Sequence, residues 1–176
     1  MSISKRAGLF LAACLVAPAA FAQTPQLGTK ITEVDVGAWA ITVLPDGTNL
    51  PKGSGTAAQG AKIYEEKCVA CHNTGGKGGP YATLVSEAPL QGRGIEAPKT
   101  IRNFWANATT VYDYIRRAMP WPQPRTLSDE EVYALVAYIL EQNKIIEPGT
   151  VMDAKSLPQV KMPNRDNFIV KFPDKI

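Results

Sequence analysis

The seven residues KCVACHN, from Lys67 to Asn73, decide how this chain folds. They place two cysteines three positions apart, Cys68 and Cys71, directly before a histidine, His72. Such residues occur in structural zinc sites, in thiol redox pairs and at sites of covalent haem attachment. The chain contains three cysteines and one histidine in total, so the number of available ligands separates these alternatives.

The zinc and thiol alternatives fit the sequence poorly. A structural zinc takes four cysteine or histidine ligands, and outside the N-terminal segment that contains Cys14 the chain offers only three. A thioredoxin-like pair begins a helix that follows a strand, where the helix dipole lowers the thiol pKa. Here the cysteines come at the end of a helical pattern, and thiol chemistry has no use for the adjacent histidine.

Covalent haem attachment uses every residue of the motif. Cys68 and Cys71 can each add to one vinyl group of a haem, and His72 is then held at the iron as the proximal ligand. A single motif of this kind predicts one haem c with its iron. A chance Cys-Xaa-Xaa-Cys-His in a soluble protein is the remaining alternative.

The N-terminus predicts export. Lys5 and Arg6 precede an apolar run that ends in Ala20-Phe21-Ala22, the small-Xaa-small pattern of a signal-peptidase site. We expect residues 1–22 to be removed and the mature protein to be periplasmic. The run is too short for a transmembrane helix, so membrane anchoring is not expected. Acylation of Cys14 as a lipoprotein cysteine is the rival interpretation.

The charge of the mature chain argues against a nucleic-acid partner. Lys5 and Arg6 account for two of the 19 basic residues, and none of the 16 acidic residues lies in residues 1–22, so the mature formal charge is +1. Two haem propionates would bring it to about −1. The net charge therefore gives no argument for binding to nucleic acid or to a membrane surface.

The residues before the motif predict an irregular arm and then a helix. Residues 24–55 are rich in turn-forming residues, with a possible short strand at residues 38–43. A helix is expected from about Thr56, with apolar side chains at helical spacing up to Cys68. Gly60 within this helix suggests the close approach of another helix.

Two more helices and a tail follow the motif. One helix is expected at residues 109–118, before Pro120, and the last begins after Ser128, where Glu131 completes a capping box. The proline-bearing tail is expected to form an extended strap. The expected domains are a signal peptide at 1–22, an irregular arm at 23–55, a haem domain at 56–146 and the strap at 147–176.

The second axial ligand is sought by elimination. No second histidine and no further cysteine remain in the mature chain, so the candidates are a methionine sulfur, a lysine amine or an open site. Met119 is favoured because it ends a helix and the following Pro120 fixes its position. Met152 and Met162 lie in the strap, where methionine more often fills gaps in a core.

Three further residues are expected near the haem. The Pro80 carbonyl is the candidate acceptor for the second ring N–H of His72, since a ligating imidazole usually donates that proton. Trp105 and Tyr114 flank the segment that leads to Met119, and one of their polar groups is expected to bind a propionate. The alternatives are that Pro80 only stiffens its loop and that both aromatics are ordinary core residues.

Together these motifs resemble those of a known protein class. The pattern of Gly60, Tyr64, the haem motif, Gly79-Pro80, Met119-Pro120 and LSDEEVYALVAYIL resembles class I bacterial c-type cytochromes. The resemblance implies an all-α fold with crossing N- and C-terminal helices around one covalent haem, in which Gly60 and Tyr64 contact Tyr138. The stretches AWAITVLPDGTNLPKGSG, TIRNFWANATTVYDYIRRAMPWPQP and LPQVKMPNRDNF resemble the cytochrome subunit of Sox-type sulfite (sulfane) dehydrogenases. Larger members of that family carry two haem domains, whereas this chain has one motif.

The resemblance implies single-electron transfer. The expected donor is a molybdenum sulfite dehydrogenase, and the expected acceptor is a downstream cytochrome or oxidase. The alternative in the same class is a general diffusible electron carrier. The alternative in another class is a haem enzyme, such as a thiosulfate dehydrogenase or a peroxidase, but the first typically needs a cysteine on the iron and the second a distal histidine or an open site. A cytochrome c′-type gas sensor would carry the motif near its C-terminus.

Basic residues are concentrated around Met119. They are expected to ring the exposed haem edge and to steer an acidic partner onto it. Their alternative role is to neutralise the propionates or to complement a helix C-terminus. The residues concerned are Arg93, Lys99, Arg102, Arg116, Arg117 and Arg125.

Overall fold

The computed structural model describes residues 27–92 and 94–168. The expected signal peptide at 1–22, Cys14 and Arg93 therefore lie outside the described residues. The chain divides into two units, Met1–Trp39 and Ala40–Ile176, and the second is called the helical unit below. In the described residues no helix is long and apolar enough to cross a bilayer.

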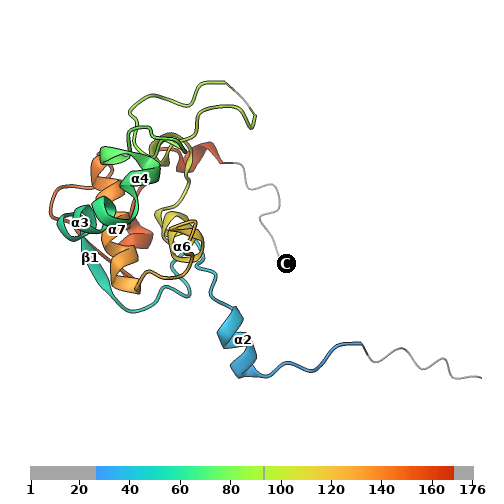
Figure 1. Cartoon of the computed structure of the whole chain (residues 1–176). Coiled ribbons are helices and arrows are strands. Elements are labelled where there is room, and N and C mark those ends of the chain that lie inside the picture. Colours follow the sequence, from blue (N-terminus) through green and yellow to red (C-terminus); the bar gives the residue numbers. More distant parts are fainter. Residues whose placement is uncertain (1–26, 93, 169–176) are drawn as a thin grey trace, which may run out of the picture. The chain divides into compact units, whose positions relative to one another are not determined.

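Helices dominate the helical unit (Figure 1). Its helices are α3 (Ala57–Lys67), α4 (Val69–His72), α5 (Ile101–Phe104), α6 (Ala108–Ala118) and α7 (Asp129–Gln142). The strands β1 (Ser54–Thr56) and β2 (Val151–Asp153) pair antiparallel, with Gly55 opposite Met152. Short 3-10 turns lie at Thr74–Gly76, Leu157–Gln159 and Arg165–Asn167.

Side-chain caps explain where the main helices begin. At the start of α3, the Thr56 hydroxyl accepts a hydrogen bond from the Gln59 N–H, and the Gln59 side-chain oxygen accepts one from the Thr56 N–H. Ser128 and Glu131 form the same reciprocal pair at the start of α7, which confirms the capping box expected there. These bonds satisfy backbone donors that a helix N-terminus leaves unpaired.

Helices α3 and α7 are packed almost backbone to backbone. A Cβ atom at Gly60 would lie 1.9 Å from the Ala134 carbonyl oxygen, so only glycine allows this approach. Tyr64, fully buried, packs on Tyr138 with ring centroids 5.0 Å apart. The expected contact of Gly60 and Tyr64 with Tyr138 is thus present, and it fixes the end of α3 that leads into Cys68.

The strand expected at residues 38–43 is absent, because residues 38–39 end a helix and residues 40–43 are irregular. Helix α2 (Glu33–Trp39) begins with Thr32 N–H donating to Asp35 Oδ2 at 2.9 Å, while Asp35 N–H donates to Thr32 Oγ1. The strand expected at residues 38–43 is therefore wrong. Its last residue, Val43, donates its N–H to the Asp113 carboxylate of α6 at 3.1 Å instead of to a neighbouring strand.

The tail contributes to the core of the helical unit. Met152, Leu157 and Met162 are each at most 3% exposed, and Val160 is also buried. Proline spacing alone gave no sign of this, because buried positions in an irregular segment follow no period. Strand β2 joins the tail to β1, directly before α3.

Candidate haem site

The haem motif forms a single helical turn. Cys68 is the N-cap of α4, and its carbonyl accepts N–H bonds from Cys71 at 3.1 Å and His72 at 3.0 Å. The Cys68 N–H in turn donates to the Tyr64 carbonyl at the end of α3. Positions three and four apart on a helix share a face, so both thiols and the imidazole belong to one short element. Both cysteines are free thiols and half-buried.

The surroundings of Cys68 argue against thiol redox chemistry. Burial raises the pKa of Cys68 to about 11, although the positive charge of Lys67 acts in the opposite direction and lowers it. A redox-active thiol needs a lowered pKa, so this thiol is not activated for disulfide exchange. Within residues 27–92 and 94–168, no group of three His, Cys, Asp or Glu side chains could hold a metal ion.

The imidazole of His72 is held by Ala82 and not by Pro80. His72 Nδ1 lies 2.9 Å from the Ala82 carbonyl oxygen, so Pro80 as the acceptor is wrong. The reason lies in Gly79, whose Cβ position is only 2.6 Å from the Cys71 carbonyl oxygen. The loop therefore runs against the α4 backbone at Gly79, and the chain must continue to Ala82 before a carbonyl reaches the ring.

This bond decides which ring nitrogen is free. A carbonyl oxygen can only accept a hydrogen bond, so Nδ1 carries the proton and Nε2 keeps its lone pair. A metal-ligating histidine is commonly held in this way by a backbone carbonyl. The arrangement of His72 therefore fits a ligand to haem iron, with the free thiol of Cys68 one helical turn before it and that of Cys71 directly before it.

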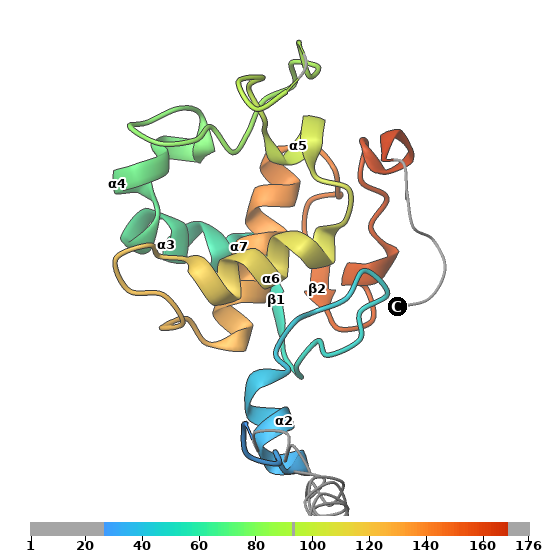
Figure 2. The same cartoon turned by 90° about the vertical axis from the view of Figure 1, so that its right-hand side faces the viewer.

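Met119 lies in a different environment from the other described methionines. It is the C-cap of α6, its N–H donates to the Ile115 carbonyl at 3.0 Å, and its side chain is half-buried at the edge of the core. Met152 and Met162 are 2% and 3% exposed inside the core. In Figure 2, the end of α6 and the loop after it lie on the same side of the helical unit as α4.

Trp105 and Tyr114 contact each other. Their ring centroids are 5.6 Å apart in an edge-to-face arrangement, and Tyr114 is 48% exposed. Their binding to a propionate stays a prediction, as does any contact of Pro80 with haem.

Several of the basic residues around Met119 are already engaged. Arg116 donates to Asp129 Oδ1 at 3.0 Å, and Arg117 is paired with the buried carboxylate of Asp113. Arg102 donates to the Asn143 carbonyl at 2.7 Å. Sequence reasoning missed these partners, although the spacing of Asp113 and Arg117, four residues apart on a helix, is a recognised signal for such a pair.

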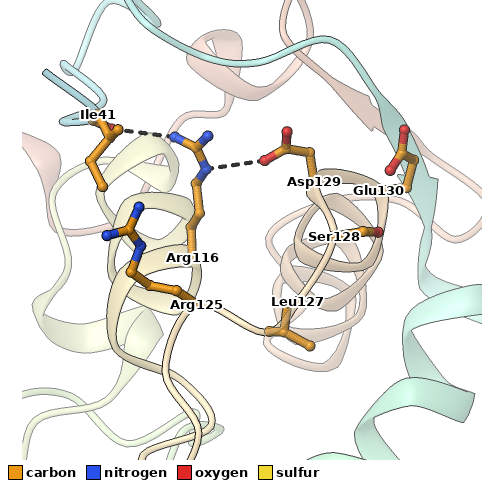
Figure 3. A pocket seen from close by; sticks show the side chains of 7 residues that line it. All are labelled: Ile41, Arg116, Arg125, Leu127, Ser128, Asp129 and Glu130. Atoms are coloured by element: carbon orange, nitrogen blue, oxygen red, sulfur yellow. Dashed lines mark hydrogen bonds and ion pairs between the residues drawn. The ribbon is translucent and has the colours of Figure 1, made fainter. Parts of the chain in front are cut away.

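Arg116 also borders a pocket of about 400 Å³ (Figure 3). Arg125, Leu127 and Ser128 contribute to its lining, and Arg116 lies between Ile41 and Asp129, bonded to both. The pocket carries side chains of both charge signs, and none of the expected haem ligands lines it. It is therefore separate from the candidate haem site.

Comparisons with known proteins support a cytochrome c domain in this chain. Residues 55–139 match the family described as cytochrome C oxidase, cbb3-type, subunit III. Over 126 residues the chain is 26% identical to a thiosulfate dehydrogenase of Stutzerimonas stutzeri (strain A1501), which covers 64% of this chain. The chain spans only 39% of that relative's length.

A solved structure gives the broader match. A chain in the crystal structure of the sulfane dehydrogenase SoxCD from Paracoccus pantotrophus matches with a TM-score of 0.74 and 32% sequence identity. The match covers 86% of this chain and 73% of that one. A cytochrome c domain implies haem c with its iron, and the free thiols and His72 Nε2 suit that group. This chain belongs to the c-type cytochromes and resembles the cytochrome subunit of Sox-type sulfane dehydrogenases.

Proposed function

We propose that this chain is a periplasmic monohaem cytochrome that accepts single electrons from a molybdenum sulfite dehydrogenase during sulfur-compound oxidation. A downstream cytochrome or oxidase would then take them. The similarity to a chain of the SoxCD structure supports the sulfur-oxidising role. The observation that carries the haem assignment is the hydrogen bond from His72 Nδ1 to Ala82, which leaves Nε2 as the free nitrogen.

In this proposal each residue of the site has one task. Cys68 and Cys71 would attach the haem, and His72 Nε2 and the Met119 sulfur would be the ligands to its iron. The haem, when bound, supplies one-electron chemistry, and a methionine ligand raises its potential. The protein fixes the imidazole through Ala82, holds the thiols on one helical turn and keeps Met119 at the end of α6. Burial of Met152 and Met162 supports the choice of Met119.

The finer features of the fold belong to the same proposal. The haem domain would extend over residues 56–146, with the arm at 23–55 and the strap at 147–176 outside it. Contact of Gly60 with Ala134 supports a crossing of α3 and α7 as in class I cytochromes. The family match over residues 55–139 supports the N-terminal boundary of this domain.

The decisive experiment mixes the oxidised holoprotein with the molybdenum enzyme and sulfite. We expect the α-band of reduced haem to appear only when all three are present. Reduction by sulfite without the enzyme would contradict the electron-acceptor role. Equal reduction by unrelated dehydrogenases would favour a general diffusible carrier.

The similarity to a thiosulfate dehydrogenase calls for a separate control. The holoprotein is incubated with thiosulfate and ferricyanide, and tetrathionate is measured. We expect none, because no cysteine besides Cys68 and Cys71 remains in the proposed mature chain. Turnover would identify this chain as an enzyme.

Two measurements test attachment and export. After denaturation, acid acetone should leave the colour with the protein, and its extraction would show that the cysteines are not bonded to haem. Mass spectrometry of the exported protein should find Gln23 at its N-terminus. A diacylglyceryl group on Cys14 would support a lipoprotein instead.

A further inference from the structure

Arg116 connects three separate parts of the helical unit. It lies in the last turn of α6, three positions before Met119. Its Nε donates to Asp129 Oδ1 at 3.0 Å, and its Nη1 donates to the Ile41 carbonyl at 3.4 Å (Figure 3). The side chain is 25% exposed, and that of Asp129 is 34% exposed, so both are partly shielded from water.

The ion pair closes the base of the loop that begins with Met119. Arg116 precedes this loop, residues 119–128, and Asp129 is the first residue of α7 after it. Within the loop, residues 121–126 are all exposed. Its internal bonds include Gln123 N–H to the Pro120 carbonyl and Thr126 Oγ1 to the Gln123 carbonyl. The loop has few buried contacts, so its position depends strongly on how its ends are held.

The contact with Ile41 is supported by a neighbouring bond on the same face of α6. Asp113, three residues before Arg116, accepts the Val43 N–H at 3.1 Å and is 5% exposed. Residues three apart lie side by side on a helix. Ile41 and Val43 are thus fastened to α6 at two adjacent points, and Arg116 rests against a fixed carbonyl.

We propose that Arg116 is a positioning residue that keeps Met119 on the haem iron by closing the base of its loop. This inference rests on the proposed role of Met119 as an axial ligand. Replacement of a methionine ligand by an external ligand requires the loop to move away, and the Arg116–Asp129 pair resists that movement. Arg116 is therefore assigned to the stability of the ligand set and not to the docking surface.

The test uses Arg116→Leu in the ferric holoprotein. Leucine keeps part of the apolar stem but loses both donors. The measurement is the rate at which imidazole replaces the Met119 sulfur, followed by loss of the charge-transfer absorbance in the red. We expect this rate to rise about five- to tenfold, since one partly buried ion pair and one hydrogen bond are lost. The affinity for imidazole should rise by a similar factor.

Glu131→Gln supplies the matched control. Glu131 also lies in the first turn of α7 and pairs with Lys67 at 2.6 Å, with side-chain exposures of 29% and 34%. Glutamine can retain the capping bond to Ser128, so this variant removes a similar ion pair, the one to Lys67 of α3, and leaves the Arg116–Asp129 pair intact. Its imidazole rate should equal that of the wild type. Equal rates in the wild type, Arg116→Leu and Glu131→Gln would overturn the inference.

Failure of the inference can be told apart from failure of the ligand assignment. If Met119 is not a ligand, Met119→Ala retains the red absorbance of the wild type. If Met119 is a ligand but Arg116 does not hold it, Met119→Ala loses the absorbance while Arg116→Leu behaves like Glu131→Gln. Should Arg116→Leu not fold, Asp129→Asn weakens the same pair from the other side, and an unchanged imidazole rate there also overturns the inference.

Discussion

The α3–α7 contact and the α4–Met119 side of the helical unit are built in opposite ways. In the first, backbones meet at Gly60 and Ala134, and Tyr64 is fully buried against Tyr138. On the second, Cys68, Cys71, His72 and Met119 remain half-buried. The first region is complete with protein atoms alone, whereas the second presents four side chains able to bond a haem. The protein therefore joins a closely packed support to a set of candidate haem-binding side chains.

The largest expected effect is a loss of stability at the α3–α7 contact. In Gly60→Ala the new methyl group would overlap the Ala134 carbonyl, so α3 and α7 must separate. We expect the free energy of unfolding to fall by about 4 kcal/mol, at the upper end for a point mutation. Urea unfolding measures this loss. Gly37→Ala is the control, since no atom lies within 4 Å of its Cβ position, and a similar loss there would contradict the packing argument.

Substitutions of the methionines should affect stability in one region, and the spectrum and haem potential in the other. Met152→Ala and Met162→Ala should each lower the free energy of unfolding by about 3 kcal/mol, because buried side chains leave cavities. Their spectra and haem potentials should match the wild type. Met119→Ala should lose the red charge-transfer absorbance and lower the potential, where each 59 mV equals about 1.4 kcal/mol.

Two outcomes would contradict this division among the methionines. Retained absorbance in Met119→Ala would exclude its sulfur as a ligand. A spectral change in Met162→Ala, with an unchanged free energy of unfolding, would indicate that the methionine ligand is Met162 in the tail.

A smaller effect is expected at the exposed surface near Met119. Arg125 is exposed, and the described residues show no ion pair to it. Arg125→Glu should slow reduction by the proposed molybdenum enzyme several-fold in low salt without changing the haem potential. The difference should shrink at high salt, as the Debye length falls from about 10 Å at 0.1 M to about 3 Å at 1 M. Stopped-flow mixing measures both.

Arg165→Glu provides the same charge change on the tail, where we expect little effect on the rate. Equal slowing in both variants would indicate a general charge effect and not a docking site. Arg93→Glu, outside the described residues, is expected to behave like Arg125→Glu if it belongs to the same surface.

The smallest effect concerns the aromatic pair. If the Trp105 indole N–H bonds a propionate, Trp105→Phe should change the haem potential by about 30 mV, which is about 0.7 kcal/mol for a one-electron couple. The pH dependence of the potential should change as well, because a propionate loses its donor. Voltammetry at several pH values measures both quantities. An unchanged titration would leave Trp105 as a packing partner of Tyr114.

The sequence predicted the helices with clear local signals. The capping box of Ser128 and Glu131 marks the start of α7, and the periodic apolar residues after Thr56 mark α3. The numbers of cysteines and histidines reduced the possible kinds of site, because too few of these residues are present for a four-ligand zinc site or a second histidine ligand. These signals lie within a few residues of one another, so local physical chemistry is sufficient to read them.

The wrong prediction for the partner of His72 and the missed ion pair of Arg116 both concern contacts between separate segments. Pro80 was expected to hold His72, but the close passage of Gly79 along α4 shifts the acceptor to Ala82. The pairing of Arg116 with Asp129 depends on the position of α7 relative to α6. No periodicity within either segment encodes such a contact, because it is set by tertiary packing.

The pairing of β1 with β2 has a consequence for how the protein is made. Gly55 lies just before the helix that delivers the haem cysteines, and its partner Met152 comes from the tail. Chains emerge from the ribosome with the N-terminus first, and contacts between distant positions slow folding. The β1–β2 pairing therefore forms late, and under the proposed function Cys68 and Cys71 would be accessible for haem attachment before the tail has taken its place.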